Sequence, residues 1–346
     1  MKLLIITQKV DRDDPVLGFF HGWLAKFAEK FESVSVICLQ KGVYDLPSNV
    51  QVYSLGKEHG GNKLKYIFKF FHLCFFSLNY SSVFVHMNQE YILLGGLFWK
   101  ILSKKIYLWR NHKKGNLLTR IAVLLSEKVF CTSRDSYTAK FKKTVLMPVG
   151  IDTDLFKDGK MERRKNSILS LGRISLVKNL HIIIAAARIL RERGVNFVLD
   201  IVGDPANLGD VDYKKKLVEE NKDLTGDGLV NFYPSVPNYE TPEIYSKYEI
   251  FLNLTPSGSF DKTILEAAAC GSLPIIVNTS LSGAEAFKDL IIELEPNKIA
   301  EKIEFWLKAD ENMKREVSQK LRDYVFQNHS LNALIGKLET CIKAKK

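Results

Sequence analysis

The sequence predicts an α/β protein of two domains, each built on a doubly wound parallel sheet. Lys2–Thr7 and Val34–Leu39 are short apolar runs on either side of the helix-like segment Phe19–Phe31, which together make a β–α–β unit. A second series of apolar runs alternating with amphipathic segments begins at Ser167, after a polar connection. The length of 346 residues exceeds that of one typical domain and suits two.

The first half continues the alternation of strands and helices. Four more short strands are expected, at Ser82–His86, Lys105–Trp109, Lys128–Cys131 and Thr144–Met147. The loop between Thr7 and Phe19 follows the first strand, where open α/β sheets bind ligands. Gly18, directly before the helix, lets a backbone approach a phosphate, although a plain turn glycine explains it equally well. The loop has no G-x-G-x-x-G pattern, which argues against a nicotinamide cofactor.

The second half starts after Pro148–Gly150, where a polar stretch without periodicity places the domain joint at about residues 150–166. Leu180–Arg193 is an amphipathic helix, and Lys298–Lys346 is mostly helical by pattern. The expected strands are Ser167–Leu171, Phe197–Val202, Val230–Tyr233, Ile250–Leu254, Leu273–Val277 and Leu290–Ile292.

The amino-acid composition is that of a globular protein without membrane-spanning segments. Apolar residues make up 46% and charged residues 26%, as in soluble globular proteins. The N-terminus lacks the pattern of a signal peptide, and no apolar run reaches about 18 residues, so no transmembrane helix is expected. The five cysteines are far apart and show no CxxC or Cys/His spacing. We expect reduced thiols in a cytosolic protein and no zinc site.

Positive charge is concentrated in the first half. Residues 1–156 contain 22 Lys and Arg against 12 Asp and Glu, whereas residues 157–346 contain 28 against 27. The first half therefore meets an anionic partner, such as a membrane surface, nucleic acid or a phosphorylated acceptor, or is simply a solvated basic face. No nucleic-acid-binding module is recognisable. Asn62–Tyr80 interleaves lysines with aromatics, which suits a helix at a membrane interface or one packed on the sheet.

Several polar groups of the second half converge on one edge of its predicted sheet. Arg173 and Lys178 share the loop after the first strand, and both can reach one diphosphate. Gly203 ends the next strand. Thr255–Pro274 follows a later strand and combines a polar loop with a helix start near Asp261, where backbone N–H groups and the helix dipole favour phosphate. An ordinary loop–helix connection has the same local pattern. The prediction of a ligand site therefore depends on all of these groups lying at one edge of the sheet.

Two histidines lie at or just after strand ends in the first half, His86 and His112. A histidine at that edge can contact hydroxyls or a developing charge, or it can be a buried structural residue. Polar and basic neighbours favour His112 as the functional one.

At this point a family resemblance is strong. The motifs GRISLVKN, IVGD, SVPNYETPEIYSKYEIFLNLTPS and FDKTILEAAACGSLPI resemble, in this order, the retaining GT-B glycosyltransferases of family 4, also described as glycosyl transferase group 1. The resemblance spans nearly the whole chain. It implies a GT-B fold with two Rossmann-like domains facing across a cleft. Residues 1–155 would bind the acceptor and 156–325 the nucleotide-sugar donor, with a helix at about 326–346 packing back on the first domain.

The resemblance also implies a site. Arg173 and Lys178 match the pair that holds the donor diphosphate, and Glu266 matches the second glutamate of the E-x7-E motif, which contacts the donor ribose. His112 looks like the histidine next to the reacting sugar. These four are the expected catalytic residues. The expected donor-binding residues are Gly18, Gly203, Val236, Pro237, Ser259, Phe260, Asp261, Lys262, Thr263 and Ile264, with Val236 and Pro237 at the nucleobase.

One position departs from the family pattern. The first glutamate of E-x7-E is replaced by Gly258, and the loop contains Asp261 and Lys262, where the family usually has small residues. We hypothesise that Asp261 or Lys262 takes over contacts with the sugar or phosphate.

The implied function is transfer, with retention, of a hexose-type sugar from a UDP- or GDP-linked donor to a saccharide or lipid-linked acceptor in cell-surface polysaccharide or glycan synthesis. No cofactor and no metal are expected, because the donor is a substrate and the cations suffice. The expected location is cytoplasmic, including the inner membrane face. Two alternatives stay open: a nucleotide-sugar isomerase or epimerase of the same fold, and a non-catalytic nucleotide-sugar binding protein.

Overall fold

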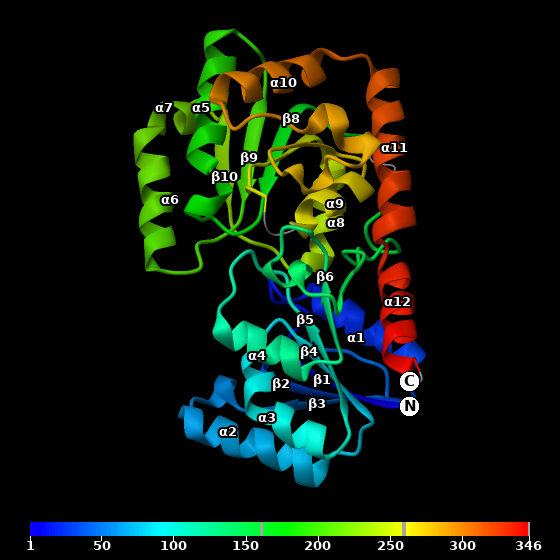
Figure 1. Ribbon diagram of the computed structural model, residues 1–346. Coiled ribbons are helices and arrows are strands. Elements are labelled where there is room, and N and C mark those ends of the chain that lie inside the picture. Colours follow the sequence, from blue (N-terminus) through cyan, green and yellow to red (C-terminus); the bar gives the residue numbers. More distant parts are fainter. Residues whose placement is uncertain (160–161, 258–260, 345–346) are drawn as a thin grey trace. The chain divides into compact units, whose positions relative to one another are not determined.

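The computed structural model describes residues 1–159, 162–257 and 261–344, which form two compact units (Figure 1). The N-terminal unit comprises Met1–Gly150 and the chain from Leu331 onward. The C-terminal unit comprises Ile151–Ser257 and Asp261–Ser330. None of the helices in the described ranges is both long enough and apolar enough to cross a bilayer.

The N-terminal unit is built on a seven-stranded parallel sheet. Its strands are β1 (Lys2–Val10), β2 (Ser33–Lys41), β3 (Val50–Ser54), β4 (Ser82–His86), β5 (Lys105–Trp109), β6 (Lys128–Cys131) and β7 (Thr144–Leu146). Their order is β3-β2-β1-β4-β5-β6-β7, so the direction of winding reverses between β1 and β4. The edge strand β3 was not predicted, because its VQVYS sequence is short and half exposed.

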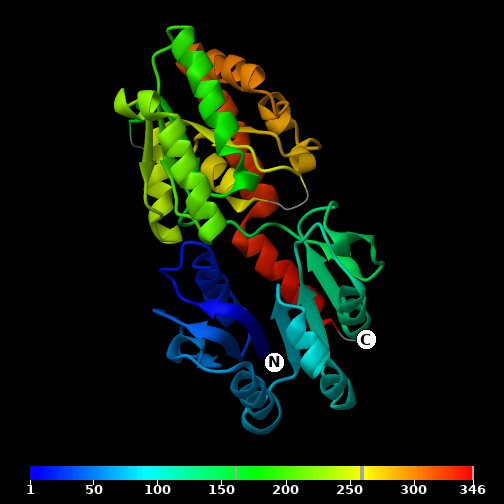
Figure 2. The same ribbon diagram turned by 90° about the vertical axis from the view of Figure 1, so that its left-hand side faces the viewer.

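Helices cover both faces of this sheet. On one face lie α1 (Phe19–Lys30) and α12 (Leu331–Lys343), which share a core with alternate residues of β1. Figure 2 shows α12, in red, against the strands, and the Tyr107 hydroxyl donates to the Ile342 carbonyl at 3.2 Å. The other face carries α2 (Lys63–His72), a π-helical turn η2 (Leu73–Ser77), α3 (Glu90–Ile101) and α4 (Leu117–Leu125).

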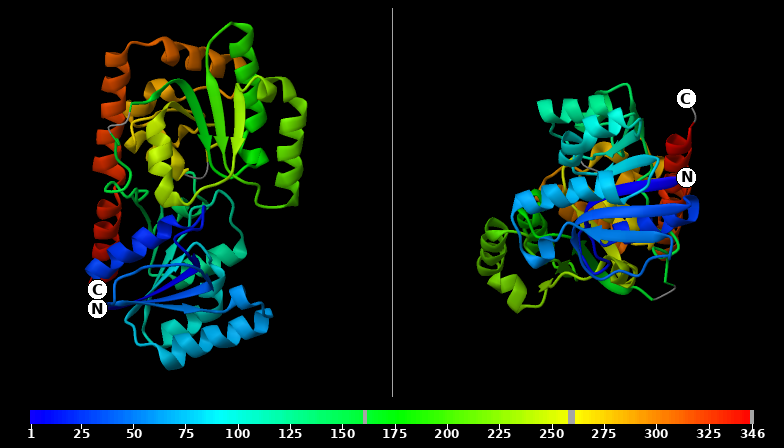
Figure 3. Two further views of the ribbon diagram at one scale, coloured as in Figure 1. Left: turned by 180° about the vertical axis from the view of Figure 1, so that it is seen from behind. Right: turned by 90° about the horizontal axis from the view of Figure 1, so that it is seen from below.

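The C-terminal unit repeats the same winding on five parallel strands (Figure 3, left). They are β8 (Arg164–Leu171), β9 (Val198–Val202), β10 (Val230–Tyr233), β11 (Tyr248–Asn253) and β12 (Leu273–Ile276). The order β10-β9-β8-β11-β12 places the reversal between β8 and β11. The expected strand at Leu290–Ile292 is wrong. Leu290 ends a 3₁₀ helix, and Ile291 forms only one bridge, to Ile276, because the run is short and α10 begins soon after it.

The helices of this unit form two packed groups. One contains α5 (Leu180–Glu192) and α10 (Pro296–Lys308), and the other contains α8 (Thr241–Lys247), α9 (Lys262–Ala269) and α11 (Glu311–His329). Two further helices, α6 (Leu208–Glu220) and α7 (Lys222–Gly226), connect β9 to β10. The two parallel sheets with their helices confirm the predicted α/β class.

Candidate functional site

The carboxyl ends of β8 and β11 flank the reversal point of the five-stranded sheet, where open α/β sheets bind ligands. The chain leaves β8 through Gly172 and β9 through Gly203, whose φ angles are 139° and 156°. A Cβ on Gly203 would overlap the Gly172 carbonyl oxygen. The close approach of these two backbones therefore explains the glycine predicted at the ligand edge.

Lys178 ends a short 3₁₀ turn, Leu176–Lys178, in the loop after β8. Asn179 follows in the left-handed conformation and begins α5, with φ at 53°. Its side-chain amide donates to the Leu254 carbonyl at 2.9 Å, which ties the loop after β8 to the end of β11. This tie holds the lysine beside the loop that leads to α9.

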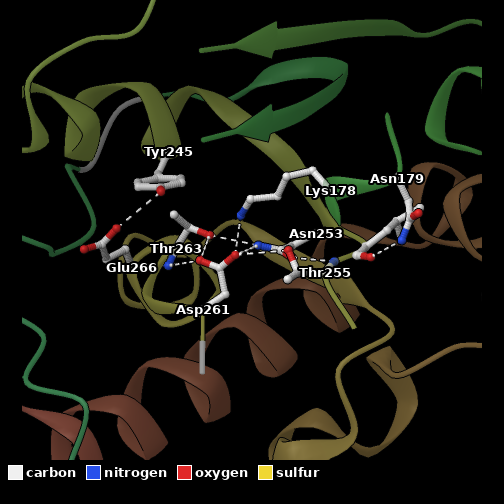
Figure 4. A network of polar contacts seen from close by, with 9 residues as sticks. Lys178, Asn179, Tyr245, Asn253, Thr255, Asp261, Thr263 and Glu266 are labelled. Carbon is white, nitrogen blue, oxygen red and sulfur yellow. Dashed lines mark hydrogen bonds and ion pairs between the residues drawn. The ribbon is translucent and has the colours of Figure 1, made fainter. Parts of the chain in front are cut away.

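Asp261 is the centre of the polar network in Figure 4. One carboxylate oxygen accepts from the Thr263 hydroxyl at 2.8 Å and from the Thr263 backbone N–H at 3.2 Å. The other accepts from the Asn253 amide at 2.9 Å and the Thr255 hydroxyl at 3.2 Å, and it pairs with the Lys178 ammonium. The structure thus confirms the helix start near Asp261, which is the N-cap of α9.

This environment decides the charge of Asp261. Burial raises the pKa of its carboxyl, but the Lys178 charge and the donated hydrogen bonds outweigh burial and hold the pKa well below its usual range. The sequence predicted that backbone N–H groups at this helix start would be available to a phosphate. Instead, the Asp261 carboxylate accepts from the Thr263 N–H, and the Asp261 backbone carbonyl accepts from the Ile264 N–H at 3.3 Å. The protein's own carboxylate occupies the favourable end of the helix dipole.

Glu266 lies one turn further along α9 and is 3% exposed. Its carboxylate accepts from the Asn238 amide at 3.3 Å and from the Tyr245 hydroxyl at 3.4 Å, and the Lys262 ammonium lies 3.9 Å away. Burial raises the pKa of Glu266, with Lys262 and Asn238 opposing it, and burial lowers the pKa of Lys262. The N-cap and the first turns of α9 thus hold two carboxyls, Asp261 and Glu266, whose pKa values shift in opposite directions.

The segment expected at the nucleobase approaches this cluster. Val236 and Pro237 are half-buried and lead into the 3₁₀ turn that begins at Asn238. Asn238 is also the donor to Glu266, so Pro237 is adjacent in sequence to a residue of the cluster. The loops after β9 and β10 are joined as well, because the Asp204 carboxylate accepts from the Ser235 N–H at 2.9 Å.

Arg173 is exposed on the same loop as Lys178 and, within the described residues, forms no hydrogen bond or ion pair. Close by, the Ser175 hydroxyl is buried without a hydrogen-bond partner in the described part of the chain. Sequence reasoning did not single out Ser175, Asn253, Thr255, Asn238 or Tyr245. Asn253 is the last residue of β11, and Thr255 follows it closely. Their position at the end of a strand was the one feature of the sequence that could have identified them as site residues.

The other predicted donor residues fall into two groups. Lys262 and Thr263 belong to the first turn of α9, whereas the Ile264 side chain is fully buried in the core. The inward face of α9 needs an apolar residue there, and the expected part of Ile264 in donor binding stays a prediction. Ser259 and Phe260, like Gly258, lie outside the described residues. Within the described residues, no three His, Cys, Asp or Glu side chains are grouped so as to hold a metal ion.

The candidates of the N-terminal unit form a separate set. Gly18 is the N-cap of α1, and a Cβ there would lie 2.5 Å from the Asp14 carbonyl oxygen and 2.6 Å from that of Arg12. The loop's own backbone therefore requires glycine at this position. The alternative of a turn glycine explains the residue without a ligand, and its expected place near the diphosphate stays a prediction.

The two histidines differ in exposure. His86 is buried, stacks on Phe20 with ring centroids 4.1 Å apart, and has Nδ1 3.2 Å from the Thr7 hydroxyl. His86 is thus a structural residue. His112 is exposed in the loop after β5, with Nδ1 3.0 Å from the Lys114 backbone nitrogen. His112 is thus accessible, and its expected functional role stays a prediction.

Comparison with known proteins links this geometry to a family. The chain matches the family described as Glycosyl transferases group 1 over residues 152–324. It is 29% identical over 195 residues to the GtfA subunit of the UDP-N-acetylglucosamine–peptide N-acetylglucosaminyltransferase of Streptococcus parasanguinis, covering 55% of this chain and 35% of that protein. It is 28% identical over 155 residues to the D-inositol 3-phosphate glycosyltransferase of Frankia alni, covering 41% of this chain and 38% of that protein. The chain thus spans little more than a third of each relative.

Solved structures match over the whole chain. HepE of Anabaena, in complex with UDP and glucose, has a TM-score of 0.79 at 16% identity, with complete coverage of both chains. Sucrose-phosphate synthase of Thermosynechococcus elongatus has a TM-score of 0.74 at 16% identity and covers 99% of this chain and 98% of that one. Likeness at this identity shows the fold. With half of its length matching the family, the chain belongs to the glycosyl transferases group 1 family and has the GT-B fold predicted for it.

Proposed function

We propose that this chain is a retaining glycosyltransferase that moves a hexose-type sugar from a UDP- or GDP-linked donor to a saccharide or lipid-linked acceptor. The observation that carries the proposal is the meeting of Lys178, Asp261 and Glu266 at the reversal point of the C-terminal sheet, in a chain of this family. The solved structures with UDP or UDP-glucose and the relative that uses UDP-N-acetylglucosamine support a nucleotide-sugar donor.

Arg173 and Lys178 are the groups that would bind the donor diphosphate. Arg173 is exposed and carries a planar fork of donors, which suits two phosphate oxygens at once. Lys178 is held by Asp261 and by the fixed start of α5, so its ammonium needs little ordering when a phosphate arrives. Each charge-assisted hydrogen bond to phosphate contributes about 1.5–3 kcal/mol.

The same two cations would promote the reaction. When the bond between the sugar and the diphosphate breaks, the negative charge on the departing diphosphate increases. Preorganised positive groups stabilise that charge more in the transition state than in the bound donor, which lowers the barrier. We include no resident metal in this proposal, because Arg173 and Lys178 supply the positive charge that the leaving group needs.

Glu266 and the segment at Val236 and Pro237 would bind the nucleoside. Among the described residues, the buried Glu266 carboxylate accepts two long hydrogen bonds, at 3.3 and 3.4 Å, and it can accept shorter ones from ribose hydroxyls. The half-buried pair at Val236 and Pro237 offers an apolar surface for the base. His112, in the N-terminal unit, keeps its proposed role beside the reacting sugar.

The proposal also includes the class of acceptor and the cellular location of the reaction. The basic first half suits an acceptor that carries phosphate, and a lipid-linked saccharide at the inner membrane face has that chemistry. Such an acceptor would place the enzyme in the synthesis of a cell-surface polysaccharide or glycan.

A donor screen tests the proposal. Thermal unfolding is followed with UDP, GDP, ADP and their sugars, because a ligand at a hundred times its Kd stabilises the folded state by about 2.7 kcal/mol. The expected result is a shift with one nucleotide family, which Lys178→Ala largely removes. Lys314→Ala is the matched control, since Lys314 also pairs with a buried carboxylate but at the opposite edge of the sheet.

A product assay then separates the alternatives. Release of nucleoside diphosphate together with a glycosylated acceptor of unchanged anomeric configuration supports the proposal. Conversion of the donor sugar into an isomer without acceptor would identify an isomerase or epimerase instead. Donor binding without any conversion across saccharide and lipid-linked acceptors would leave a non-catalytic binding protein.

A further inference from the structure

The outward sides of α2, η2, α3 and α4 in the N-terminal unit carry large apolar side chains exposed to solvent. The most exposed are Phe76 at 83%, Ile101 at 79%, Phe68 at 74% and Leu124 at 73%. We call the outward surface of these four segments, residues 63–77, 90–101 and 117–125, the α2–α4 face. Single exposed apolar residues are ordinary, but a contiguous group marks an interaction surface.

The exposed residues follow helical periodicity. On α4, Leu117, Ile121 and Leu124 are exposed at i, i+4 and i+7, while Ala122 and Val123 are buried against the sheet. The same i, i+4 spacing separates exposed Leu64 from Phe68 on α2 and Leu97 from Ile101 on α3. A helix that covers a sheet needs one apolar stripe. These helices have a second, outward stripe that the fold does not use.

The helices lie in one continuous layer (Figure 1). The Phe98 ring of α3 lies 5.6 Å from Phe71 and 5.4 Å from Phe75, which joins α3 to α2 and η2. On its other side α3 approaches α4 closely, because a Cβ on Gly96 would lie 2.8 Å from a methyl of Leu125. The outward stripes are therefore neighbours on one surface.

The helices on the opposite face of the same sheet do not share this exposure of apolar side chains. Among the described residues of α1 and α12, no large apolar side chain is exposed. Their apolar residues are turned inward, to the core that they share with β1. The N-terminal unit therefore has one helical layer of ordinary surface and one layer with an apolar surface.

The charge around the α2–α4 face has one sign. Residues 61–126 contain ten Lys and Arg and a single acidic residue, Glu90. Lys63, Lys65 and Lys69 are exposed on α2 and alternate with Leu64 and Phe68. Exposed lysines among exposed aromatic and aliphatic residues form the surface that a protein lays on an anionic bilayer.

We propose that the α2–α4 face binds an anionic lipid surface, with Phe68, Phe76 and Ile101 inserted among the acyl chains and the lysines paired with lipid phosphates. Charge complementarity selects this occupant. Two copies of the chain that met through this face would bring two sets of lysines together with one acidic residue each, and like charges oppose that contact. This inference does not depend on the proposed transfer reaction.

Vesicle flotation with the full chain tests the inference. Phosphatidylcholine vesicles are compared with vesicles that also contain phosphatidylglycerol. We expect at least about tenfold tighter binding to the anionic vesicles, weakened by salt as counterions screen the lysines. Lys63→Gln/Lys65→Gln/Lys69→Gln should weaken binding about a hundredfold, at about fivefold per lysine. Phe68→Ser/Phe76→Ser/Ile101→Ser should weaken it at least about tenfold at every salt concentration.

Matched controls lie on α6 in the C-terminal unit. Leu208→Ser removes a side chain that is 84% exposed, and Lys215→Gln removes an exposed lysine, so both should leave vesicle binding unchanged. Equal binding by wild type and both triple variants would overturn the inference, as would no binding to anionic vesicles. So would a dimer that the apolar triple variant disperses without any effect on vesicles. UDP-induced thermal stabilisation, measured on the same samples, reports the donor site separately, so either proposal can fail alone.

Discussion

Two buried lysine–carboxylate pairs lie at opposite edges of the C-terminal sheet. Lys178 pairs with Asp261 where β8 and β11 end, and Lys314 pairs with Glu249 at 2.8 Å where β11 begins. In both pairs less than a fifth of each side chain is exposed. By chemistry and burial they are alike, yet only the first lies at the edge where open α/β sheets bind ligands.

The surroundings of the two pairs differ in the way expected for a pair at the proposed site and a pair of the scaffold. Lys314 also contacts the Leu307 carbonyl at 3.5 Å and Glu311 at 3.2 Å, and Glu249 accepts from the Asn166 N–H at 2.6 Å. Those contacts join α11 to the start of the sheet. At the other edge the pair lies on loops, beside the exposed Arg173. The two pairs therefore differ in their position in the sheet and in the residues around them, although their chemistry and burial are alike.

The largest effect should come from the scaffold pair. Lys314→Ala leaves the Glu249 carboxylate buried without its counter-ion, which destabilises by about 3 kcal/mol. Denaturant unfolding of the variant should show this loss. Nucleotide affinity, measured well below the midpoint of unfolding, should match wild type. A nucleotide affinity reduced as much as in Lys178→Ala would remove the distinction between the two edges.

The site pair should show the reverse. Lys178→Ala is expected to weaken donor binding and turnover about a hundredfold, because it removes charge-assisted hydrogen bonds to the diphosphate of about 2–3 kcal/mol. Calorimetric titration with the nucleotide that passes the thermal screen measures the loss. Lys178→Arg, which keeps the charge, should restore part of it. An unchanged donor affinity in Lys178→Ala would contradict the proposed site.

A pH titration sharpens the comparison further, since the site edge holds two carboxyls with opposite shifts. The folded-state pKa of Asp261 is lowered, so its stabilisation is present above about pH 4 and is lost as the pH falls towards the folded pKa. The difference in unfolding free energy between wild type and Asp261→Asn should therefore shrink with acid.

Glu266 should behave in the opposite way. Its folded-state pKa is raised, so ionisation costs stability as the pH rises above about 4.3, the value expected for an unfolded chain. Glu266→Gln should gain stability relative to wild type between that pH and neutrality. The free energy of unfolding measured from about pH 2 to 7 tests both variants, Asp261→Asn in the part below about pH 4 and Glu266→Gln in the part above it. Parallel curves for wild type and variants in those ranges would refute the assigned charges.

The smallest effect is expected from removal of divalent cations. Because Arg173 and Lys178 are the proposed partners of the diphosphate, transfer in excess EDTA should stay within about twofold of the untreated rate. A product assay with and without added Mg²⁺ measures it. Loss of activity in EDTA that Mg²⁺ restores would show that the two cations do not suffice.

Much of the fold could be predicted because buried parallel strands are short apolar runs between breaks. Ser82–His86, Lys105–Trp109, Lys128–Cys131 and Val230–Tyr233 were predicted with the bounds that the structure shows. The edge strand β3 was missed, since one of its sides is exposed and its pattern is mixed. The prediction of a strand at Leu290–Ile292 was wrong although the run is apolar. An apolar run becomes a strand only when it has a partner strand along its length, and Ile291 forms a single bridge.

The site was predictable in part. The loop positions of Arg173 and Lys178 and the helix start at Asp261 followed from residue type and order along the chain. The pairing of Lys178 with Asp261 did not, because it joins residues from two loops that meet only when β8 and β11 lie side by side. Nor could Asn253 and Thr255 be singled out, since polar residues at a strand end are common and their hydrogen bonds depend on the fold.

The C-terminal helix has a consequence for synthesis on the ribosome. Leu334, Leu338 and Ile342 of α12 belong to the same core as Trp23 and Phe27 of α1, which are synthesised well before α12. The core of the N-terminal unit is therefore incomplete until α12 has been synthesised, whereas every described residue of the C-terminal unit lies between 151 and 330. Domains usually fold in the order of their synthesis. In this chain the C-terminal unit, whose synthesis begins second, can be the first to complete its folding.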